Sequence, residues 1–228
     1  MACFVLIHGA YQGGWIWQPV AERLRAAGHV VYAPSLDGCA ERRGALRAGI
    51  TTETHGQEIA ELLFFEDLQE VVLVGTSAGG MVMCAAAEPA RERIARLVFA
   101  DALALRDGER IGDIVSRPAP VSTPLATGPS PEDAAGRMFK NLPAGVKEWA
   151  LARYTPHPIA AMEAPVRLGR FWDLPWKATV IRCTRASNPP EPHHRRTAAA
   201  LRAPYLELDT GHYPMLSAPD ELTRMILA

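Results

Sequence analysis

The sequence predicts an α/β protein with a doubly wound, mostly parallel sheet and a helical lid insertion. Short apolar runs alternate with helical stretches over residues 1–102, an order typical of parallel strands joined by helices. One of these runs, residues 71–74, leads directly into a G-x-S-x-G sequence at residues 75–79. The alternation breaks between residues 103 and 175, where proline is frequent. The first two observations predict the sheet, and the third predicts an inserted segment.

Each predicted strand is a short apolar run that ends at turn-forming residues. In chain order we expect strands over residues 3–7, 29–33, 71–75, 97–101, 179–183 and 205–208. Each predicted helix is an amphipathic or alanine-rich stretch, and several end at a stop signal such as Gly28 or Pro89. We expect helices over residues 17–27, 52–67, 78–87, 194–203 and 219–227.

Residues 103–175 are expected to form a separate lid. Prolines recur along this stretch, and proline cannot donate the backbone hydrogen bond that a central strand requires. Short helical patterns occur at residues 131–140 and 146–154. We therefore expect residues 1–102 and 176–228 to form the core. The lid is expected over the carboxyl edge of the core sheet, where it supplies most of the wall of a substrate pocket.

Composition and charge count against several classes of partner. With 228 residues, the chain is large enough for one domain with a sizeable core. A net charge of −1 gives no electrostatic case for nucleic acid or an acidic membrane as partner. The chain opens on a strand pattern without a charged leader, so we expect a cytoplasmic protein. Its four cysteines lack metal-ligand spacing, so we expect reduced packing residues and no metal.

Ser77 is the predicted nucleophile. Between a strand and a helix, a G-x-S-x-G turn strains the serine backbone and exposes its hydroxyl above the sheet. Gly75 and Gly79 fit this turn because a Cβ at either position would crowd the close approach of strand and helix. The alternative is a small-residue turn in another kind of α/β protein. A phosphate-binding loop is not predicted, because neither G-x-x-x-x-G-K-[ST] nor G-x-G-x-x-G is present.

A serine hydroxyl needs a general base, and His212 is the best-placed histidine. It follows the last predicted strand, so its loop is expected at the same sheet edge as Ser77. His8 follows the first strand and is expected mainly to shape the loop there. We expect His193 and His194 to open a helix and to be solvated, His55 and His157 to be surface or insertion residues, and His29 to begin a strand.

Backbone N–H groups are expected to stabilise the oxyanion that forms during acyl transfer. Ala78 follows the nucleophile at a predicted helix start, and Ala10 lies in the glycine-rich loop after the first strand. We therefore expect the N–H groups of Ala10 and Ala78 to form an oxyanion hole. Such chemistry requires no cofactor.

Several motifs together resemble the α/β-hydrolase superfamily: FVLIHGAYQGGWIW at residues 4–17, the turn at residues 75–80, CTR and PP within residues 183–190, and GH at residues 211–212. Within it, the chain is similar to the branch of plant methylesterases, hydroxynitrile lyases and their bacterial esterase relatives. The similarity covers nearly the whole chain outside the insertion. It implies an α/β-hydrolase fold, Ser77 as nucleophile, His212 as base, Ala10 and Ala78 as oxyanion donors, and a lid over the acyl pocket.

The acid of the catalytic triad is the point where the chain departs from this branch. The branch usually places an aspartate just after the strand at residues 179–183, but this chain has R-A-S-N-P-P at residues 185–190. Asp101, at the end of the preceding strand, is the candidate we favour to orient His212. The alternatives are Ser187 or Asn188 as uncharged partners, Glu191 beyond the prolines, or an incomplete triad.

These features predict a cofactor-free serine hydrolase that cleaves a carboxylic ester, thioester or lactone of a small-to-medium, largely apolar molecule. We expect substrate contacts from Tyr11, Trp149, Trp172 and Tyr213. One alternative is a small-molecule binder or biosynthetic tailoring enzyme with an incomplete triad. The other is a hydroxynitrile-type lyase, although such relatives place threonine and lysine where this chain has Gly9 and Tyr213. The oligomeric state stays open.

Overall fold

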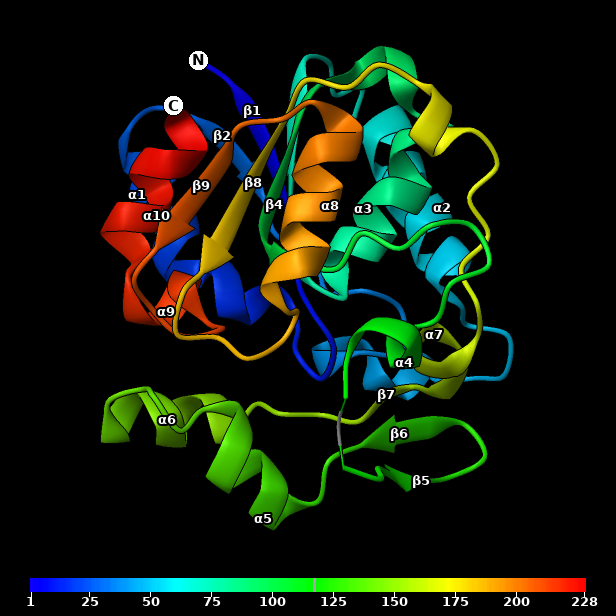
Figure 1. Ribbon diagram of the computed structural model, residues 1–228, viewed down its shortest axis with the longest axis vertical. Helices are drawn as coiled ribbons and strands as arrows, with labels where there is room; N and C mark the ends of the chain where they lie inside the picture. Colours follow the sequence, from blue (N-terminus) through cyan, green and yellow to red (C-terminus); the bar gives the residue numbers. More distant parts are fainter. Residues whose placement is uncertain (117) are drawn as a thin grey trace.

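The computed structural model describes residues 1–116 and 118–228, and its centre is a six-stranded sheet (Figure 1). The strands lie in the order β2-β1-β3-β4-β8-β9, and every neighbouring pair is parallel. Because the chain winds outwards from β1 in both directions, the sheet is doubly wound, as the sequence predicted. Its strands are β1 (Cys3–Ile7), β2 (Val30–Tyr32), β3 (Val71–Ser77), β4 (Ile94–Ala102), β8 (Ala178–Cys183) and β9 (Tyr205–Leu208).

Both faces of the sheet are covered by helices, and alternate side chains of each strand enter opposite cores. In β1, Val5 and Ile7 pack into one core, whereas Phe4 and Leu6 pack into the other. Figure 1 shows α1 and α10 on one face of the sheet and α2, α3 and α8 on the other. These helices are α1 (Gln18–Ala26), α2 (Thr52–Phe65), α3 (Gly79–Ala87), α8 (Glu191–Leu201) and α10 (Pro219–Leu227). No helix in the described residues is long and apolar enough to span a membrane.

The parallel strands bring five loops to one edge of the sheet. Loops at their carboxyl ends meet there because every strand runs in the same direction. The loop at residues 8–14 follows β1, Ser77 ends β3, and Asp101 lies one residue before the end of β4. Residues 184–190 follow β8, and residues 209–213 lead from β9 into α9 (Pro214–Ser217). The fold therefore gathers most of the predicted site residues at this edge.

Residues 103–116 and 118–163 leave the sheet and form a set of short elements, several of which lie below its carboxyl edge in Figure 1. They include the predicted helical pieces and a separate three-stranded antiparallel sheet, β5-β6-β7, which the sequence did not predict. Strands this short show no readable alternation of apolar residues. The elements are α4 (Ile111–Ile114), β5 (Val121–Ser122), β6 (Ala126–Gly128), α5 (Pro131–Asp133), a π-helical turn (Ala134–Met138), α6 (Ala144–Leu151), β7 (His157–Pro158) and α7 (Ile159–Glu163).

Residues 164–177 correct the expected extent of the lid. This segment, which contains a short 3-10 helix (Phe171–Asp173), runs back to the opposite edge of the sheet (Figure 1). The return is required because β8 is parallel to β4, so the connection must reach the amino-terminal edge before β8 begins. The whole of residues 103–175 therefore does not lie over the carboxyl edge.

Candidate active site

Ser77 lies at the sharp turn between β3 and α3. Its φ angle is +49°, in the left-handed region that non-glycine residues seldom adopt. A Cβ on Gly79 would lie 2.5 Å from the carbonyl oxygens of both Ile7 and His8, so only glycine fits there. A Cβ on Gly75 would lie 2.8 Å from the carbonyl oxygen of Gly79. These contacts agree with the geometry that the G-x-S-x-G turn predicts, and strain of this kind concentrates at functional sites.

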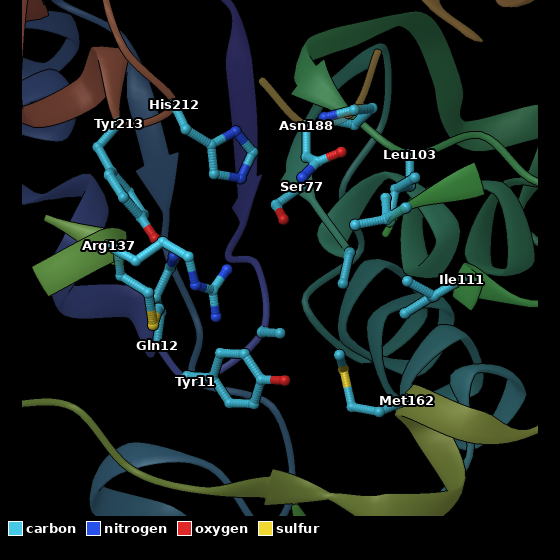
Figure 2. Close-up of a pocket in the computed structure, with 15 residues that line it drawn as sticks. Tyr11, Gln12, Ser77, Leu103, Ile111, Arg137, Met162, Asn188, His212 and Tyr213 are labelled. Atoms are coloured by element: carbon cyan, nitrogen blue, oxygen red, sulfur yellow. The ribbon is translucent and has the colours of Figure 1, made fainter. Parts of the chain in front are cut away.

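Ser77 lines a cavity of about 130 Å³ with two unlike walls (Figure 2). Figure 2 shows Leu103, Ile111 and Met162 on one side of the cavity and Arg137, His212 and Tyr213 on the other. The remaining lining residues include Ala10, Tyr11, Gln12, Ala78, Val115, Met138, Asn188 and Pro189. Core loops thus contribute more lining residues than the insertion, so the expectation that the insertion supplies most of the wall is wrong.

His212 lines the same cavity as Ser77 and contacts Asp101. In Figure 2 the imidazole ring and the Ser77 side chain face the same cavity. Nδ1 of His212 lies 2.6 Å from Oδ2 of Asp101, a short hydrogen-bond distance. Donation from Nδ1–H to the carboxylate leaves Nε2 with its lone pair, which is the tautomer that a general base requires.

A bulge in β4 directs Asp101 towards this site. Thr76 pairs with Ala100 and Ser77 pairs with Ala102, so Asp101 is an extra residue without a partner in β3. Its φ angle is +50°, and the local turn aims its side chain at β8. There Oδ1 accepts a hydrogen bond from the backbone N–H of Cys183 at 2.9 Å. The Asp101 carboxylate, although carried by β4, therefore lies near the end of the neighbouring strand β8.

His194 is a second histidine at Asp101, and the sequence did not predict its position. Both side chains are fully buried, and Nε2 of His194 lies 3.3 Å from Oδ1 of Asp101. Burial raises the pKa of the Asp101 carboxyl, but the contacts with His194 and His212 lower it more, so the net pKa is below its ordinary value. The expectation that His193 and His194 are solvated is wrong, because both are buried in α8. His193 instead accepts the backbone N–H of Ala104 at 2.9 Å.

Two of the three alternative partners for His212, Asn188 and Glu191, have other contacts. Asn188 lines the cavity, and its side-chain amide donates to the carbonyl oxygen of Ser116 at 3.3 Å. Glu191 forms ion pairs with Arg182 at 3.0 Å and with Arg195 at 2.7 Å. Asp101 is therefore the residue that we assign as the partner of His212.

Ala10 and Ala78 both border the cavity beside Ser77. Among the described residues, neither backbone N–H donates to another protein group. Ala78 directly precedes α3, where the first N–H groups of a helix have no acceptor within the helix. The Ala10 loop passes very close to the nucleophile, since a Cβ on Gly9 would lie 2.7 Å from Cβ of Ser77. Both N–H groups are thus free to serve an oxyanion.

His8 and His157 support the loop that carries Ala10. Nε2 of His8 accepts the backbone N–H of Leu36 at 3.0 Å, and its Nδ1 lies 2.7 Å from the carbonyl oxygen of Gly9. Burial lowers the pKa of His8 to about 4, so this loop-shaping histidine stays neutral near pH 7. Nδ1 of His157 accepts the N–H of Tyr11 at 3.4 Å. His157 lies in the insertion, one of the two positions expected for it, and is buried there. His55 is buried in α2, so the expectation of a surface or insertion position is wrong for this residue.

Two of the four residues expected to contact substrate, Trp149 and Trp172, do not line the Ser77 cavity. Trp149 packs edge-on against Trp15, with ring centroids 5.2 Å apart. Trp172 lies on the returning segment, and its indole N–H donates to the carbonyl oxygen of Leu105 at 3.0 Å. Both rings therefore fill packing positions. Tyr11 and Tyr213, the other two, do line the cavity.

Gln12, Arg137 and Met162 line the cavity and were missed by the sequence analysis. The position of Gln12 could have been predicted from the sequence, because this residue lies within the glycine-rich loop that carries Ala10. Arg137 and Met162 come from the insertion, where short elements give no periodic pattern that shows which side chains face the core.

One of the four cysteines, Cys84, lies buried inside α3. All four cysteines are free thiols, and burial raises the pKa of Cys84, as expected for a packing residue rather than a nucleophile. Within residues 1–116 and 118–228, no group of three or more His, Cys, Asp or Glu side chains is arranged to hold a metal ion.

The model of the alpha/beta hydrolase family matches residues 4–225 of this chain. The chain belongs to that family. This hydrolase is 32% identical over 179 residues to a carbendazim hydrolyzing esterase of Nocardioides sp. (strain SG-4G), and the match covers 74% of each chain. It is also 36% identical over 100 residues to an alpha-hydroxynitrile lyase of Arabidopsis thaliana, covering 43% of this chain and 39% of the relative.

Solved structures share the fold of this hydrolase at lower identity. An extracellular alpha/beta-hydrolase from a Paenibacillus species superimposes with a TM-score of 0.83 at 22% identity, covering 100% of this chain and 98% of the other. Polyneuridine aldehyde esterase gives a TM-score of 0.79 at 23% identity, covering 100% and 98%. These likenesses confirm the fold class that the sequence predicted.

Proposed function

We propose that this chain is a serine hydrolase that cleaves a carboxylic ester, thioester or lactone through an acyl-enzyme. One observation carries the proposal: Ser77, the His212–Asp101 pair and the free N–H groups of Ala10 and Ala78 meet at one cavity. Family membership and the similarity to an esterase support the same class of reaction.

In the proposed first half-reaction, Oγ of Ser77 attacks the carbonyl carbon while Nε2 of His212 takes the hydroxyl proton. The carbonyl oxygen becomes an oxyanion and accepts hydrogen bonds from the N–H groups of Ala10 and Ala78. The tetrahedral intermediate then expels the alkoxide or thiolate, which takes the proton from His212. The acyl group stays on Ser77.

In the second half-reaction, His212 removes a proton from water as the water attacks the acyl carbon. Collapse of the new intermediate breaks the bond to Ser77, which regains its proton from His212. Asp101 acts throughout by holding the imidazole in one orientation and by stabilising its positive charge. The lowered pKa of Asp101 keeps the carboxylate ionised at neutral pH.

The cavity supports a small substrate group next to Ser77. A volume of about 130 Å³ lies below the roughly 300–1,000 Å³ that drug-sized ligands occupy. Leu103, Ile111, Val115 and Met162 offer an apolar surface suited to an acyl chain. We propose residues 1–102 and 176–228 as the hydrolase core, and the elements from α4 to α7 as the part of the insertion that acts as a lid.

The lyase alternative gains no support from the geometry. A threonine at position 9 would place its Cβ 2.7 Å from Cβ of Ser77, closer than real side chains approach. The binder alternative rested on a missing triad acid, but Asp101 lies within hydrogen-bond distance of His212. Hydrolysis is therefore the function that we propose.

Hydrolysis of p-nitrophenyl butyrate by the purified chain tests this proposal. We expect Ser77→Ala to lower kcat by at least about 10⁴-fold, because the other members of a triad cannot replace the nucleophile. Ser116→Ala is the control, since this serine lies outside the cavity and should retain full activity. Circular dichroism should show the same fold for both variants. Undiminished turnover by Ser77→Ala would refute the proposal.

A further inference from the structure

A second cavity of about 250 Å³ adjoins the first on the His212 side. The two share Arg137, Met138, Asn188, His212 and Tyr213 as lining residues. Ser77 lines the first cavity but not the second. A molecule bound at Ser77 therefore has room to extend past His212 into a distinct space.

Three positive side chains line this second cavity. Arg137 and Lys140 reach it from the insertion, and Arg185 reaches it from the loop after β8. The lining also includes neutral polar groups, namely Asn141, Ser187, Asn188 and Ser217, beside apolar residues such as Met138 and Leu142. All of its lining residues are described by the structure, and none of them is an aspartate or glutamate. The cavity thus offers hydrogen-bond donors and positive charge to an anion.

Ion pairs outside the cavity orient two of these cations. Arg137 donates from Nε and Nη2 to the carboxylate of Asp133, at 2.9 and 2.6 Å. Arg185 donates from Nη2 to the carbonyl oxygen of Asp209 at 2.6 Å, and its Nε lies 3.3 Å from Oδ1 of the same residue. Within the described residues, Nη1 of each guanidinium and the ammonium of Lys140 have no partner. These donors are available to a ligand.

The order of the chemical steps decides which part of a substrate lies there. His212 must deliver its proton to the departing alkoxide, so the leaving group lies on the His212 side of Ser77. The apolar residues Leu103, Ile111 and Met162 lie on the other side, where the acyl chain fits (Figure 2). The leaving group is consequently the half that meets the cationic cavity.

We propose that the second cavity binds an anionic group, a carboxylate or a phosphate, on the leaving alcohol of the substrate. The substrate class is then an ester of a small apolar acid with an anionic alcohol. This inference deepens the proposed ester hydrolysis and rests on it for the direction in which the substrate lies.

The displaced triad acid fits this arrangement. The loop after β8, where relatives usually carry the acid, lines the second cavity with Arg185, Ala186 and Ser187. A carboxylate in that loop would repel an anionic leaving group. Because Asp101 supplies the acid from β4 and is fully buried, the loop carries no negative charge into the cavity.

Three butyrate esters test the substrate class: 4-(butyryloxy)benzoate, 4-(butyryloxy)phenyl phosphate and the neutral 4-(butyryloxy)benzamide. We expect KM for at least one anionic ester to be about tenfold lower than for the amide at low salt, a modest effect because the cations are exposed. Salt should reduce the preference. Preference for benzoate would identify a carboxylate site, and preference for phosphate a phosphate site. Equal KM values for all three esters would overturn the inference.

Lys140→Ala should reduce the preference about fivefold, whereas Lys140→Arg should keep it. Lys147→Ala is the matched control, because this lysine lies in α6 and lines neither cavity. A preference that survives in Lys140→Ala and Arg185→Ala alike would also overturn the inference.

A binding measurement separates this inference from the proposed function. Calorimetry on Ser77→Ala should show tighter binding of 4-hydroxybenzoate or 4-hydroxyphenyl phosphate than of 4-hydroxybenzamide, and adding Lys140→Ala should reduce the difference about fivefold. If no ester is hydrolysed in a Ser77-dependent way, the proposed function fails. The binding measurement then still tests whether the second cavity holds an anion. If the amide ester is hydrolysed but no anion binds more tightly, only the inference about the cavity fails.

Discussion

A single extra residue in β4 determines how the proposed catalytic acid reaches His212. Asp101 interrupts the pairing of β4 with β3, and its left-handed backbone turns the carboxylate towards β8. The Cys183 N–H and the imidazole of His212 then hold its two oxygens at 2.9 and 2.6 Å. The carboxylate thus contacts His212 from the end of β4, whereas relatives of this branch usually carry the acid just after the next strand of the sheet, β8.

Replacement of Asp101 by asparagine tests this role. The amide cannot stabilise a charged imidazole and favours the wrong histidine tautomer, so we expect kcat to fall by about 10⁴-fold with little change in KM. Asp220→Asn provides a control at an exposed aspartate that pairs with Arg23 on the surface. Steady-state kinetics on p-nitrophenyl butyrate give both constants. Near-normal kcat in Asp101→Asn would show that another group orients His212.

His194 is expected to position Asp101 without contacting substrate. Removal of its ring N–H in His194→Leu should lower kcat by about 10- to 100-fold, as for the loss of a hydrogen bond to a charged group, with KM unchanged. His194→Gln keeps a donor at the same place and should recover most of this loss. His193→Gln, at the neighbouring buried histidine, should retain activity. Equal losses in His194→Leu and His194→Gln would point to packing alone.

At the scale of elements, the predicted strands and helices agree with the structure to within a few residues at each end. Apolar runs and stop signals were sufficient because β1, β3 and α3 are almost wholly buried. The small β5-β6-β7 sheet escaped prediction since its strands have only two or three residues. The return of residues 164–177 follows from parallel topology, which the residue pattern does not show directly.

Alanine substitution of Gly79 tests the close packing at the turn between β3 and α3, and the same substitution of Gly145 in α6 is the control. Gly79→Ala would place a Cβ 2.5 Å from two backbone oxygens, so we expect a loss of more than about 3 kcal/mol in the free energy of unfolding. Gly145, in α6, has no atom within 4 Å of an added Cβ, and Gly145→Ala should stabilise by about 0.4–1 kcal/mol. Urea denaturation measures both values. A mild effect of Gly79→Ala would refute the close packing at the turn.

At the scale of the whole molecule, the gathering of the site at one sheet edge was predictable, and its internal contacts were not. Ser77 ends a strand, and Ala10 and His212 each follow one, so parallel topology places them together. The bulge at Asp101 and the burial of His194 depend on tertiary packing that polarity alone does not reveal. For the same reason Trp149 and Trp172 seemed to be pocket residues, although each packs elsewhere.

Buried histidines make the stability of the whole molecule depend on pH. Burial lowers the pKa of His8 and of His193 to about 4, whereas the unfolded chain titrates near about 6.5. Between these values the unfolded state binds more protons, so stability falls as the pH drops from about 6.5 towards 4. His193→Gln should reduce the loss between pH 7 and 4.5 by about 2 kcal/mol in urea titrations. The same pH dependence in the variant and the parent would contradict this origin.

Covalent labelling tests the central claim, an activated nucleophile at Ser77, most directly. The purified chain is treated with a p-nitrophenyl alkylphosphonate, and the adduct is located by peptide mass spectrometry. We predict one phosphonyl group per chain on Ser77, no adduct in Ser77→Ala, and much slower labelling in His212→Ala because the base is lost. Labelling of a different residue, or an unchanged adduct in Ser77→Ala, would contradict the account.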